Sequence, residues 1–371
     1  MTLVPHHLPD YVERGGRQVW RPPYTARGAE VFGFVVKADR TAIDGLLKDA
    51  LVEPSRGAVD YRCAHDHIMV TFAQIDRLAS ADPPDSGRGY MPEREVSVWC
   101  LAADVATTGR LVWYLPYVFT DSGQTVATGR EVYGYPKQIG WFADDYPNKL
   151  LTGGESTVFG MGIDPFNPGQ AARWLPMITA MRKTLTVGTS QQPVIATSDS
   201  DDFTVLDEFI TGFPGDVEVD TALPSGPGTE HSAAITPLGA PPPPGPPPSL
   251  PWVRRVLSGL HGIGLAGSPM DMIIDMVKNP TLVFLKQFRD VECPTKACYQ
   301  AVVEAPLGVR AMGAHYAALD PDHFELAIHD WASHPIATDL GVVNPLKPQR
   351  AFRAQFNFDI MLGEEVWRAP T

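Results

Sequence analysis

The chain has 371 residues, of which 44% are hydrophobic and 20% are charged, so it can bury a large core. Its formal net charge of −13 argues against a nucleic-acid partner, because phosphate binding needs clustered Lys and Arg. The N-terminal residues lack a charged-then-apolar signal pattern, and no apolar run approaches the ~20 residues of a membrane span. We therefore expect a cytoplasmic protein that does not interact with a membrane.

Short runs rich in β-branched and aromatic residues dominate the sequence, and turn-rich segments separate them. These runs predict strands at residues 31–36, 68–72, 95–99, 111–115, 157–159, 282–285, 299–303, 324–328 and 352–356. Helices are predicted at residues 41–51, 170–184 and 251–261. Many short strands with few helices are typical of a mainly β barrel or sandwich.

Residues 190–250 break this pattern, because they are rich in Gly and Pro and end in a nearly continuous proline run. Such a stretch cannot pair in a sheet and is expected to run as polyproline II or as a surface loop. We interpret it as an insertion between two halves of a barrel. The alternative, a ligand for an SH3-type domain, is less favoured because nothing else in the chain suggests signalling. Limited proteolysis should cut between residues 198 and 250 first.

The four cysteines give no disulfide framework in a chain of this length. Cys63 and Cys100 lie in predicted strands, where cysteine usually behaves as a small hydrophobic residue. Cys293 and Cys298 offer only two sulfurs, whereas a structural zinc site needs four ligands. We interpret this pair as two thiols beside a turn.

Two histidine clusters have spacings that resemble metal sites. His65-Asp66-His67 places alternate residues on one face of a strand, and His329-Asp330 is followed by His334. Neither cluster has a recognisable further ligand set, and histidines satisfied by hydrogen bonds are the common case for such short motifs. We therefore expect no metal.

The segment from Gly129 to Gln138 places Lys137 behind a proline, inside apolar, aromatic and glycine-rich sequence. An amine is a nucleophile only when it is neutral, so a lysine that forms an imine needs a lowered pKa from burial or from a nearby cation. For an isolated Pro-Lys pair, a surface lysine after a turn is the commoner interpretation.

Gly129-Arg130-Glu131 followed by Tyr135-Pro136-Lys137 resembles the active-site signature of the acetoacetate decarboxylase superfamily. Residues 31–36 and 39–51 resemble that family's opening strand and helix, and residues 332–340 resemble its closing segment. The resemblance implies a closed, cone-like antiparallel β-barrel with a few peripheral helices. It favours one domain over residues 1–371, with 190–250 as an insertion and 346–371 as a C-terminal extension.

In this family an interior lysine forms a Schiff base with a keto acid, and Lys137 matches that position. True decarboxylases have a second lysine directly after it, where this chain has Gln138. Burial, which alone can lower a lysine pKa by about 3–5 units, or Arg130 would then have to lower the pKa of Lys137. Members without the second lysine resemble the branch that condenses pyruvate-like acids with a second substrate and then dehydrates the product.

Further site residues are suggested around Lys137. Glu95 resembles the family's active-site glutamate, and Glu93 competes for that assignment because the alignment is uncertain by two residues. Tyr135 would share a face with Lys137 in an extended segment, as an acid, a hydrogen-bond donor or a filler of the cone. Glu131 resembles a motif carboxylate that Arg130 could pair with; together with Gly134 and Pro136 it is assigned a structural role.

Recognition of the substrate carboxylate is expected from arginine. The position that matches the family's arginine is Ala29, so Arg27 is the candidate in its place and Arg21 is a weaker one. Arg130 and Gln138 are also assigned to the substrate pocket.

These assignments lead to a carbon–carbon lyase in which Lys137 is the nucleophile and Glu95 the acid and base. We favour an aldolase-dehydratase acting on a pyruvate-like 2-oxo acid. The alternatives are a decarboxylase of acetoacetate or another 3-oxo acid, and a non-catalytic β-cone that binds a small ligand. We expect no cofactor, a small oxo acid as substrate, and a homo-oligomer.

Overall fold

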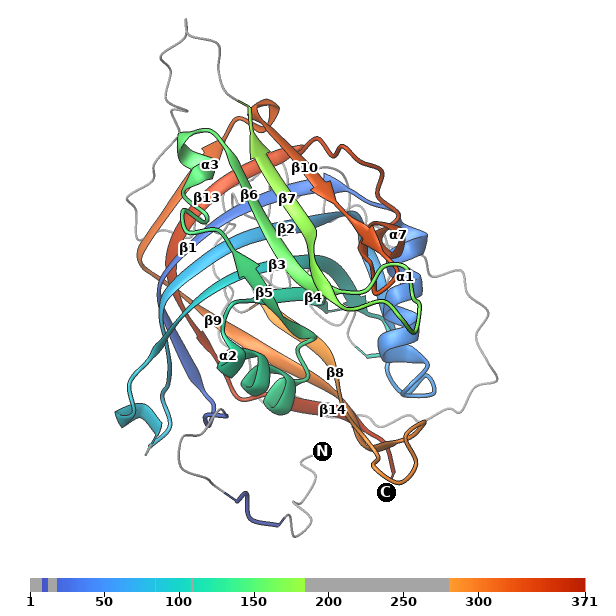
Figure 1. The fold of residues 1–371 in the computed structure, drawn as a ribbon. Coiled ribbons are helices and arrows are strands. Elements are labelled where there is room, and N and C mark those ends of the chain that lie inside the picture. The colour runs from blue at the N-terminus through green and yellow to red at the C-terminus, as the bar shows by residue number, and fades with distance from the viewer. Residues whose placement is uncertain (1–8, 13–18, 84, 108–109, 184–279, 371) are drawn as a thin grey trace, which may run out of the picture.

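The computed structural model describes residues 9–12, 19–83, 85–107, 110–183 and 280–370. The predicted helix at 251–261, the 190–250 stretch and its expected proteolysis lie outside the described residues. Strands dominate what is described, as the sequence predicts, and no helix there is long and apolar enough to cross a membrane (Figure 1).

The elements follow one another along the chain with nearly all helices in short connections. The strands before the large gap are β1 (Tyr24–Lys37), β2 (Tyr61–Ser80), β3 (Met91–Asp104), β4 (Leu111–Thr120), β5 (Lys137–Phe142), β6 (Glu155–Gly162) and β7 (Arg173–Arg182). Those after it are β8 (Thr281–Arg289), β9 (Ala297–Leu319), β10 (Phe324–Ile328), β11 (Asp330–Trp331), β12 (His334–Pro335), β13 (Arg350–Ile360) and β14 (Glu364–Arg368). The α-helices are α1 (Arg40–Leu47), α2 (Gly123–Thr128), α3 (Lys149–Thr152) and α7 (Ile336–Leu340), with π-helical turns η1 (Lys48–Val52) and η3 (Gly129–Tyr133) and 3₁₀ turns η2 (Asp85–Gly87) and η5 (Pro321–His323).

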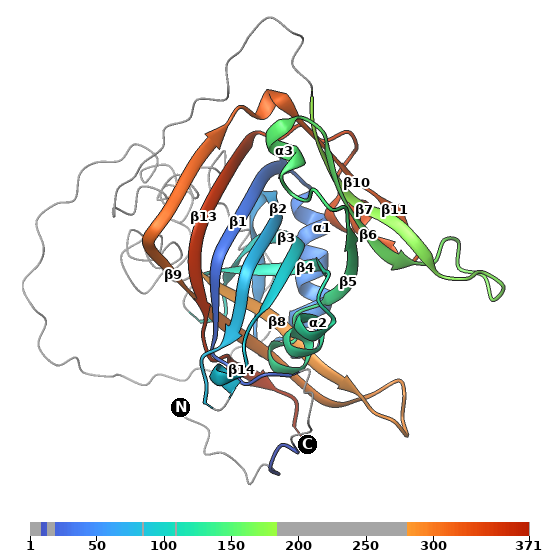
Figure 2. The ribbon, with the colours of Figure 1, turned by 60° about the vertical axis from the view of Figure 1, so that its left-hand side comes forward.

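Twelve strands form one sheet in the order β10-β7-β6-β5-β4-β3-β2-β1-β13-β9-β14, and β8 pairs with both β4 and β9. The pairings therefore link β1, β2, β3, β4, β8, β9 and β13 into a ring. Figure 2 shows β9, β13, β1, β2 and β3 side by side in a curved wall. All pairs are antiparallel except β4 with β5 and β4 with β8, so the sheet is mainly antiparallel, as expected, with two parallel pairings at β4. The helical connection α2–η3 returns the chain so that β5 runs parallel to β4.

Helix α1 confirms the helix predicted at 41–51. The Asp39 side chain caps it by accepting a hydrogen bond from the Ala42 N–H at 2.9 Å. Ile43, Leu47 and Leu51 are fully buried on one face that continues through η1.

The helix predicted at 170–184 is wrong, because β7 occupies Arg173–Arg182. β7 lies between β6 and β10, and Leu175, Met177 and Ile178 are buried there. Pro176 lacks the N–H that a helix interior needs, and it sits at an irregularity in the pairing with β6, where a proline costs little. Strand pairing has overridden the local apolar spacing.

The segment expected as a C-terminal extension, 346–371, contributes strands to the sheet. β13 lies between β1 and β9 in the ring, and β14 pairs with β9. A Cβ atom at Gly33 would lie 2.0 Å from the Phe352 ring, so the glycine on β1 leaves the space that this ring fills.

Candidate active site

The Gly-Arg-Glu part of the motif lies in the helical connection before β5. Ser122 caps α2 through a hydrogen bond from Thr125 N–H at 3.2 Å, and the helix continues into the π-helical turn η3. Gly134 ends this turn in the left-handed conformation, with φ of 88°. The chain then extends through Tyr135 and Pro136 into β5, which begins at Lys137.

Close approaches explain two glycines of the motif. A Cβ atom at Gly129 would lie 3.1 Å from Cδ of Lys137, so the lysine stem runs directly over this glycine. A Cβ atom at Gly134 would lie 2.6 Å from the Lys286 Cα on β8, a backbone atom that cannot yield. The motif thus brings the chain close to β8 and clears a path for the side chain of Lys137.

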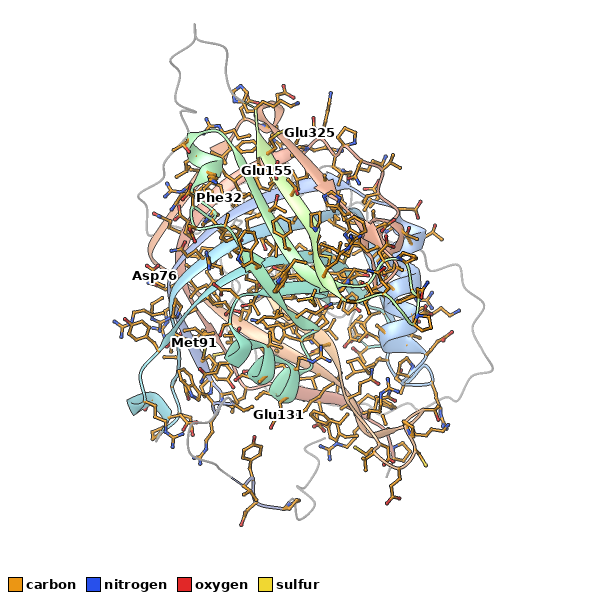
Figure 3. All side chains as sticks on the ribbon, in the orientation of Figure 1. Phe32, Asp76, Met91, Glu131, Glu155 and Glu325 are labelled. Atoms are coloured by element: carbon orange, nitrogen blue, oxygen red, sulfur yellow. The ribbon has the colours of Figure 1, made fainter. Side chains whose placement is uncertain are left out.

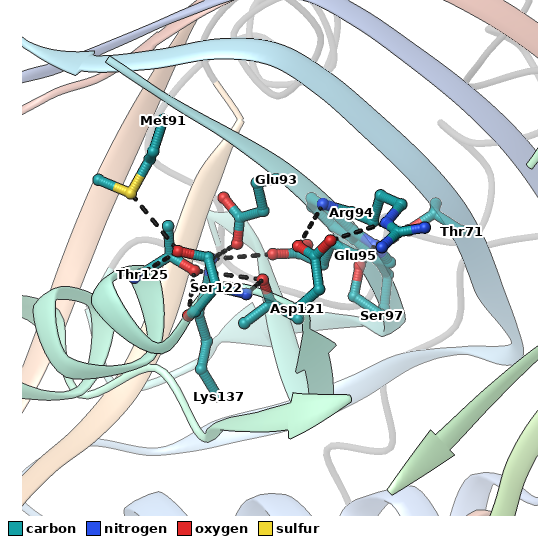
Figure 4. A network of polar contacts seen from close by, with 12 residues as sticks. Thr71, Met91, Glu93, Arg94, Glu95, Ser97, Asp121, Ser122, Thr125 and Lys137 are labelled. Atoms are coloured by element: carbon teal, nitrogen blue, oxygen red, sulfur yellow. Dashed lines mark hydrogen bonds and ion pairs between the residues drawn. The ribbon is translucent and has the colours of Figure 1, made fainter. Parts of the chain in front are cut away.

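Lys137 is buried and holds two carboxylates at once (Figure 4). Its Nζ lies 2.7 Å from Oε1 of Glu93 and 2.9 Å from Oε2 of Glu95. The Lys137 and Glu93 side chains are 9% and 1% exposed, and that of Glu95 is 16% exposed. The two glutamates alternate along β3 and so share one face. The structure therefore places both competing sequence candidates against Lys137.

The charges of this cluster oppose the effect of burial on Lys137. Burial lowers the pKa of its ammonium, but Glu93 and Glu95 raise it, and the net pKa lies above the ordinary value of 10.5. Burial raises the pKa of Glu95 above its ordinary value, as does Glu93, although Lys137 lowers it. Burial therefore does not make the Lys137 amine neutral, as imine formation requires, because its ion pair with the two carboxylates raises the pKa more than burial lowers it.

Tyr135 presents its ring to the lysine. The Lys137 Nζ lies 5.6 Å from the ring centroid, within range of a cation–π contact. The ring also packs on Phe284 of β8, at a centroid distance of 4.0 Å, and meets the Tyr133 ring edge-on at 5.8 Å. Burial raises the pKa of Tyr135, so the phenol keeps its proton and is available as a hydrogen-bond donor. Tyr135 and Phe284 therefore form an apolar wall of the site.

Gln138 contacts another part of the molecule. Its Oε1 lies 2.7 Å from Nε2 of His334 on β12, and the His334 Nδ1 lies 2.8 Å from the Ser333 hydroxyl. Adjacent residues of a strand point to opposite faces, so residue 138 does not share the face of Lys137. Gln138 thus joins β5 to the closing segment that the sequence singled out.

Arg27 and Arg130, the two arginines assigned to the substrate pocket, already have hydrogen-bond or ion-pair partners in the protein. Arg27 pairs with Asp359 on β13 at 2.9 Å and donates to the Phe358 carbonyl at 3.0 Å, so the structure does not bring it to Lys137. The exposed Arg130 donates to the Lys137 carbonyl at 3.3 Å. Within the described part of the chain, no ion pair joins Arg130 to the half-buried Glu131.

The structure adds polar residues that sequence reasoning missed. The Ser97 hydroxyl, two residues beyond Glu95, hydrogen-bonds the Glu95 carboxylate and lies 2.8 Å from the Thr71 hydroxyl on β2 (Figure 4). The Tyr146 hydroxyl donates to the Glu95 carbonyl at 2.6 Å. The alternation Glu93, Glu95, Ser97 was visible in the sequence, but the pairing with Thr71 depends on strand register.

The second predicted histidine cluster does not converge. His329 stacks on Trp331, and Asp330 accepts from the N–H and the hydroxyl of Thr338. His334 belongs to the contact with Gln138 instead. His329, which lies near Glu155 and Glu325, also lines a surface groove of about 420 Å³ over β6, β7 and β10. In Figure 3, Glu155 and Glu325 lie near the top of the view, and Met91 and Glu131 lie lower down.

Comparison with known proteins identifies the fold. No protein-family model and no curated protein matches the chain by sequence. Among solved structures, acetoacetate decarboxylase from Legionella pneumophila subsp. pneumophila strain Philadelphia 1 has 11% identity and a TM-score of 0.50, covering 98% of this chain and 93% of that one. An acetoacetate decarboxylase-like enzyme from Sphingomonas wittichii RW1 has 12% identity and a TM-score of 0.50, covering 95% of each chain. The chain therefore has the acetoacetate decarboxylase-like fold, as its motifs indicated.

Proposed function

We propose that this protein is a Schiff-base-forming carbon–carbon lyase that acts on a small oxo acid, with Lys137 as the nucleophile. The observation that carries the proposal is the buried contact of the Lys137 amine with Glu93 and Glu95 beside the ring of Tyr135. A buried lysine with two proton acceptors in direct contact suits imine chemistry, because every proton transfer has a neighbour to receive it.

The resting ammonium must lose a proton before it can attack. Glu95 is suited to accept that proton, because its raised pKa makes its carboxylate a stronger base than an ordinary glutamate. The neutral amine then attacks the substrate carbonyl carbon, and Glu95 returns the proton to the hydroxyl group that leaves as water. The product is a protonated imine between Lys137 and the substrate, held beside Glu93.

We favour aldol condensation with dehydration on a pyruvate-like 2-oxo acid over decarboxylation of a 3-oxo acid. The pKa of Lys137 is raised, because the charges of Glu93 and Glu95 outweigh the effect of its burial. In the aldol route, a carboxylate beside the imine removes a proton from the adjacent carbon and yields an enamine that attacks an aldehyde. Glu93 and Glu95 provide such bases at 2.7 and 2.9 Å from the lysine nitrogen.

The substrate carboxylate needs a cation, and Arg130 is the candidate nearest to Lys137 in the proposed pocket. Its guanidinium donates to the Lys137 carbonyl and is exposed, so it can meet an entering anion. Arg27 would have to leave Asp359 to do the same. Recognition by Arg130 would place the substrate carboxylate on the solvent side of the site and away from the two glutamates.

Trapping with borohydride tests the proposal. Incubation with pyruvate and borohydride should add one fixed mass to the peptide that contains Lys137, and Lys137→Ala should abolish it. Lys183→Ala is the matched control, because Lys183 is an exposed lysine directly after β7, and this variant should leave the adduct unchanged. Failure of trapping across a panel of 2-oxo and 3-oxo acids would favour the non-catalytic, ligand-binding alternative.

The same panel separates the two lyase reactions. Pyruvate with an aldehyde should give a conjugated enone that absorbs in the ultraviolet, whereas acetoacetate should be converted slowly. Rapid release of CO₂ and acetone from acetoacetate would refute the preference for the aldolase branch.

A further inference from the structure

His65, Asp66 and His67 form a second cluster of ionisable side chains far from Lys137. They lie on β2, and His67 pairs with Lys37 on β1. Ala73, which pairs with Glu95, lies six residues further along the same strand, about 20 Å away at the usual rise of a strand. The cluster is therefore separate from the proposed active site.

An irregularity in β2 turns all three side chains toward one point. In a regular strand the side chain of Asp66 would lie on the face opposite to its two neighbours. The register between β2 and β3 shifts between Cys63 and Ile68, and such irregularities re-aim side chains. As a result, Oδ1 of Asp66 lies 2.6 Å from Nδ1 of His67 and 3.6 Å from Nδ1 of His65.

The imidazole rings of His65 and His67 face each other through their Nδ1 atoms. Their Nδ1 atoms are 3.2 Å apart, and the side chains of His65 and His67 are 1% and 6% exposed. Asp66 is 46% exposed, so the cluster is open to solvent on one side. Three Lewis-basic atoms thus converge within 3.6 Å of one another, a spacing at which they can share protons or a cation.

We propose that His65, Asp66 and His67 bind a divalent transition-metal ion of the Zn²⁺ type. Ligands at 2.0–2.1 Å from a tetrahedral ion lie about 3.3 Å apart, which the 3.2 and 3.6 Å separations match. The 2.6 Å contact must lengthen by about 0.7 Å, and the half-exposed Asp66 side chain has the freedom to do so. Two imidazoles and one carboxylate suit Zn²⁺ rather than Ca²⁺ or Mg²⁺, which prefer oxygen ligands.

The remaining coordination position would face the solvent side, where Asp66 is exposed, and a water molecule would fill it. Lys37, whose Nζ lies 3.9 Å from Oδ2 of Asp66, is the competing cation, but it contacts the other carboxylate oxygen. Oδ1 therefore remains directed at the two imidazoles, and Lys37 can stay in place when the ion binds.

Titration of the full chain, prepared without an affinity tag, with Zn²⁺ in a calorimeter and with Co²⁺ by visible absorption tests the site. We expect one ion per chain and the intense absorption of a four-coordinate Co²⁺ complex. His65→Asn/His67→Asn should abolish both signals. The matched control is His6→Asn/His7→Asn, which removes an equal number of histidines outside the described residues and should leave the Co²⁺ absorption unchanged.

Asp66→Asn keeps the proposal testable if the double variant of the buried histidines fails to fold. Its side chain is half-exposed, so the fold should survive, and the Kd for Zn²⁺ should rise at least about tenfold. No saturable binding by the natural chain, unchanged affinity in Asp66→Asn, or full binding in a folded His65→Asn/His67→Asn protein would each overturn the proposal.

Discussion

Replacing Glu93 by glutamine tests whether carboxylates hold the Lys137 amine in its protonated form. Glutamine keeps the shape of the side chain and removes one of the two negative charges at the ammonium. Glu93 raises the pKa of Lys137 against the effect of burial, so the variant should lower that pKa.

The size of the effect follows from the geometry. At an effective dielectric constant of about 20, unit charges 2.7 Å apart attract by about 6 kcal/mol. Desolvation offsets part of this attraction, and removing one partner of a buried pair typically costs about 3–5 kcal/mol. At 1.36 kcal/mol per unit, the pKa of Lys137 should fall by about 2–4 units in Glu93→Gln.

The assay is the rate at which a small amine-reactive reagent acetylates Lys137 as pH is varied, read from the mass of the peptide. The midpoint should move to lower pH in Glu93→Gln. Glu325→Gln, which removes the carboxylate 3.5 Å from Lys183 at the surface, should leave the Lys137 midpoint unchanged. An unmoved midpoint in Glu93→Gln would refute the electrostatic account of the site.

The ion pair between Lys137 and Glu93 should also make the free energy of unfolding depend on pH in a defined direction. The folded-state pKa of Lys137 lies above the unfolded value of 10.5, so its contribution to stability is complete below that pH and is lost as pH rises through the folded value. Denaturant melts of the natural chain and Glu93→Gln should therefore differ most at neutral pH and converge in strong alkali. A difference that grows above pH 10.5 would contradict this sign.

Three further perturbations probe the surroundings of Lys137. Gly134→Ala should lower the free energy of unfolding in urea by at least about 1–3 kcal/mol, because φ is 88° and a Cβ would meet the backbone of Lys286; an unchanged midpoint would contradict the close approach. Gln138→Lys should lose the hydrogen bond to His334, costing about 1 kcal/mol, without moving the Lys137 acetylation midpoint, whereas a shift to lower pH would show that residue 138 acts on the lysine after all. Light scattering should give a mass above that of one chain, because exposed apolar side chains lie together on β5, β6 and β7: Ile139, Trp141, Met161 and Trp174. Replacing two of these four residues by serine should lower that mass.

Local patterns in the sequence determined most of the strands and the identity of the central residue. Alternating β-branched and aromatic runs predicted strands that the structure contains, such as β10 at residues 324–328, because side chains alternate along every strand regardless of its partners. The helix predicted at 41–51 likewise matches α1 and η1, whose first turn is capped by the local side chain of Asp39. The resemblance of the Gly-Arg-Glu and Tyr-Pro-Lys segment to a known family singled out Lys137, and the structure lays the stem of this lysine against Gly129.

Tertiary structure decided everything that depends on register between distant strands. The sequence could not choose between Glu93 and Glu95, and the pairing of β3 with β4 and of β4 with β5 brings both to Lys137. The sequence predicted a helix where β7 lies, because the spacing of apolar residues along the chain contains no information about which strands lie beside it. The charge state of Lys137 had the same origin: burial alone lowers its pKa, but two carboxylates more than 40 residues away along the chain reverse the sign.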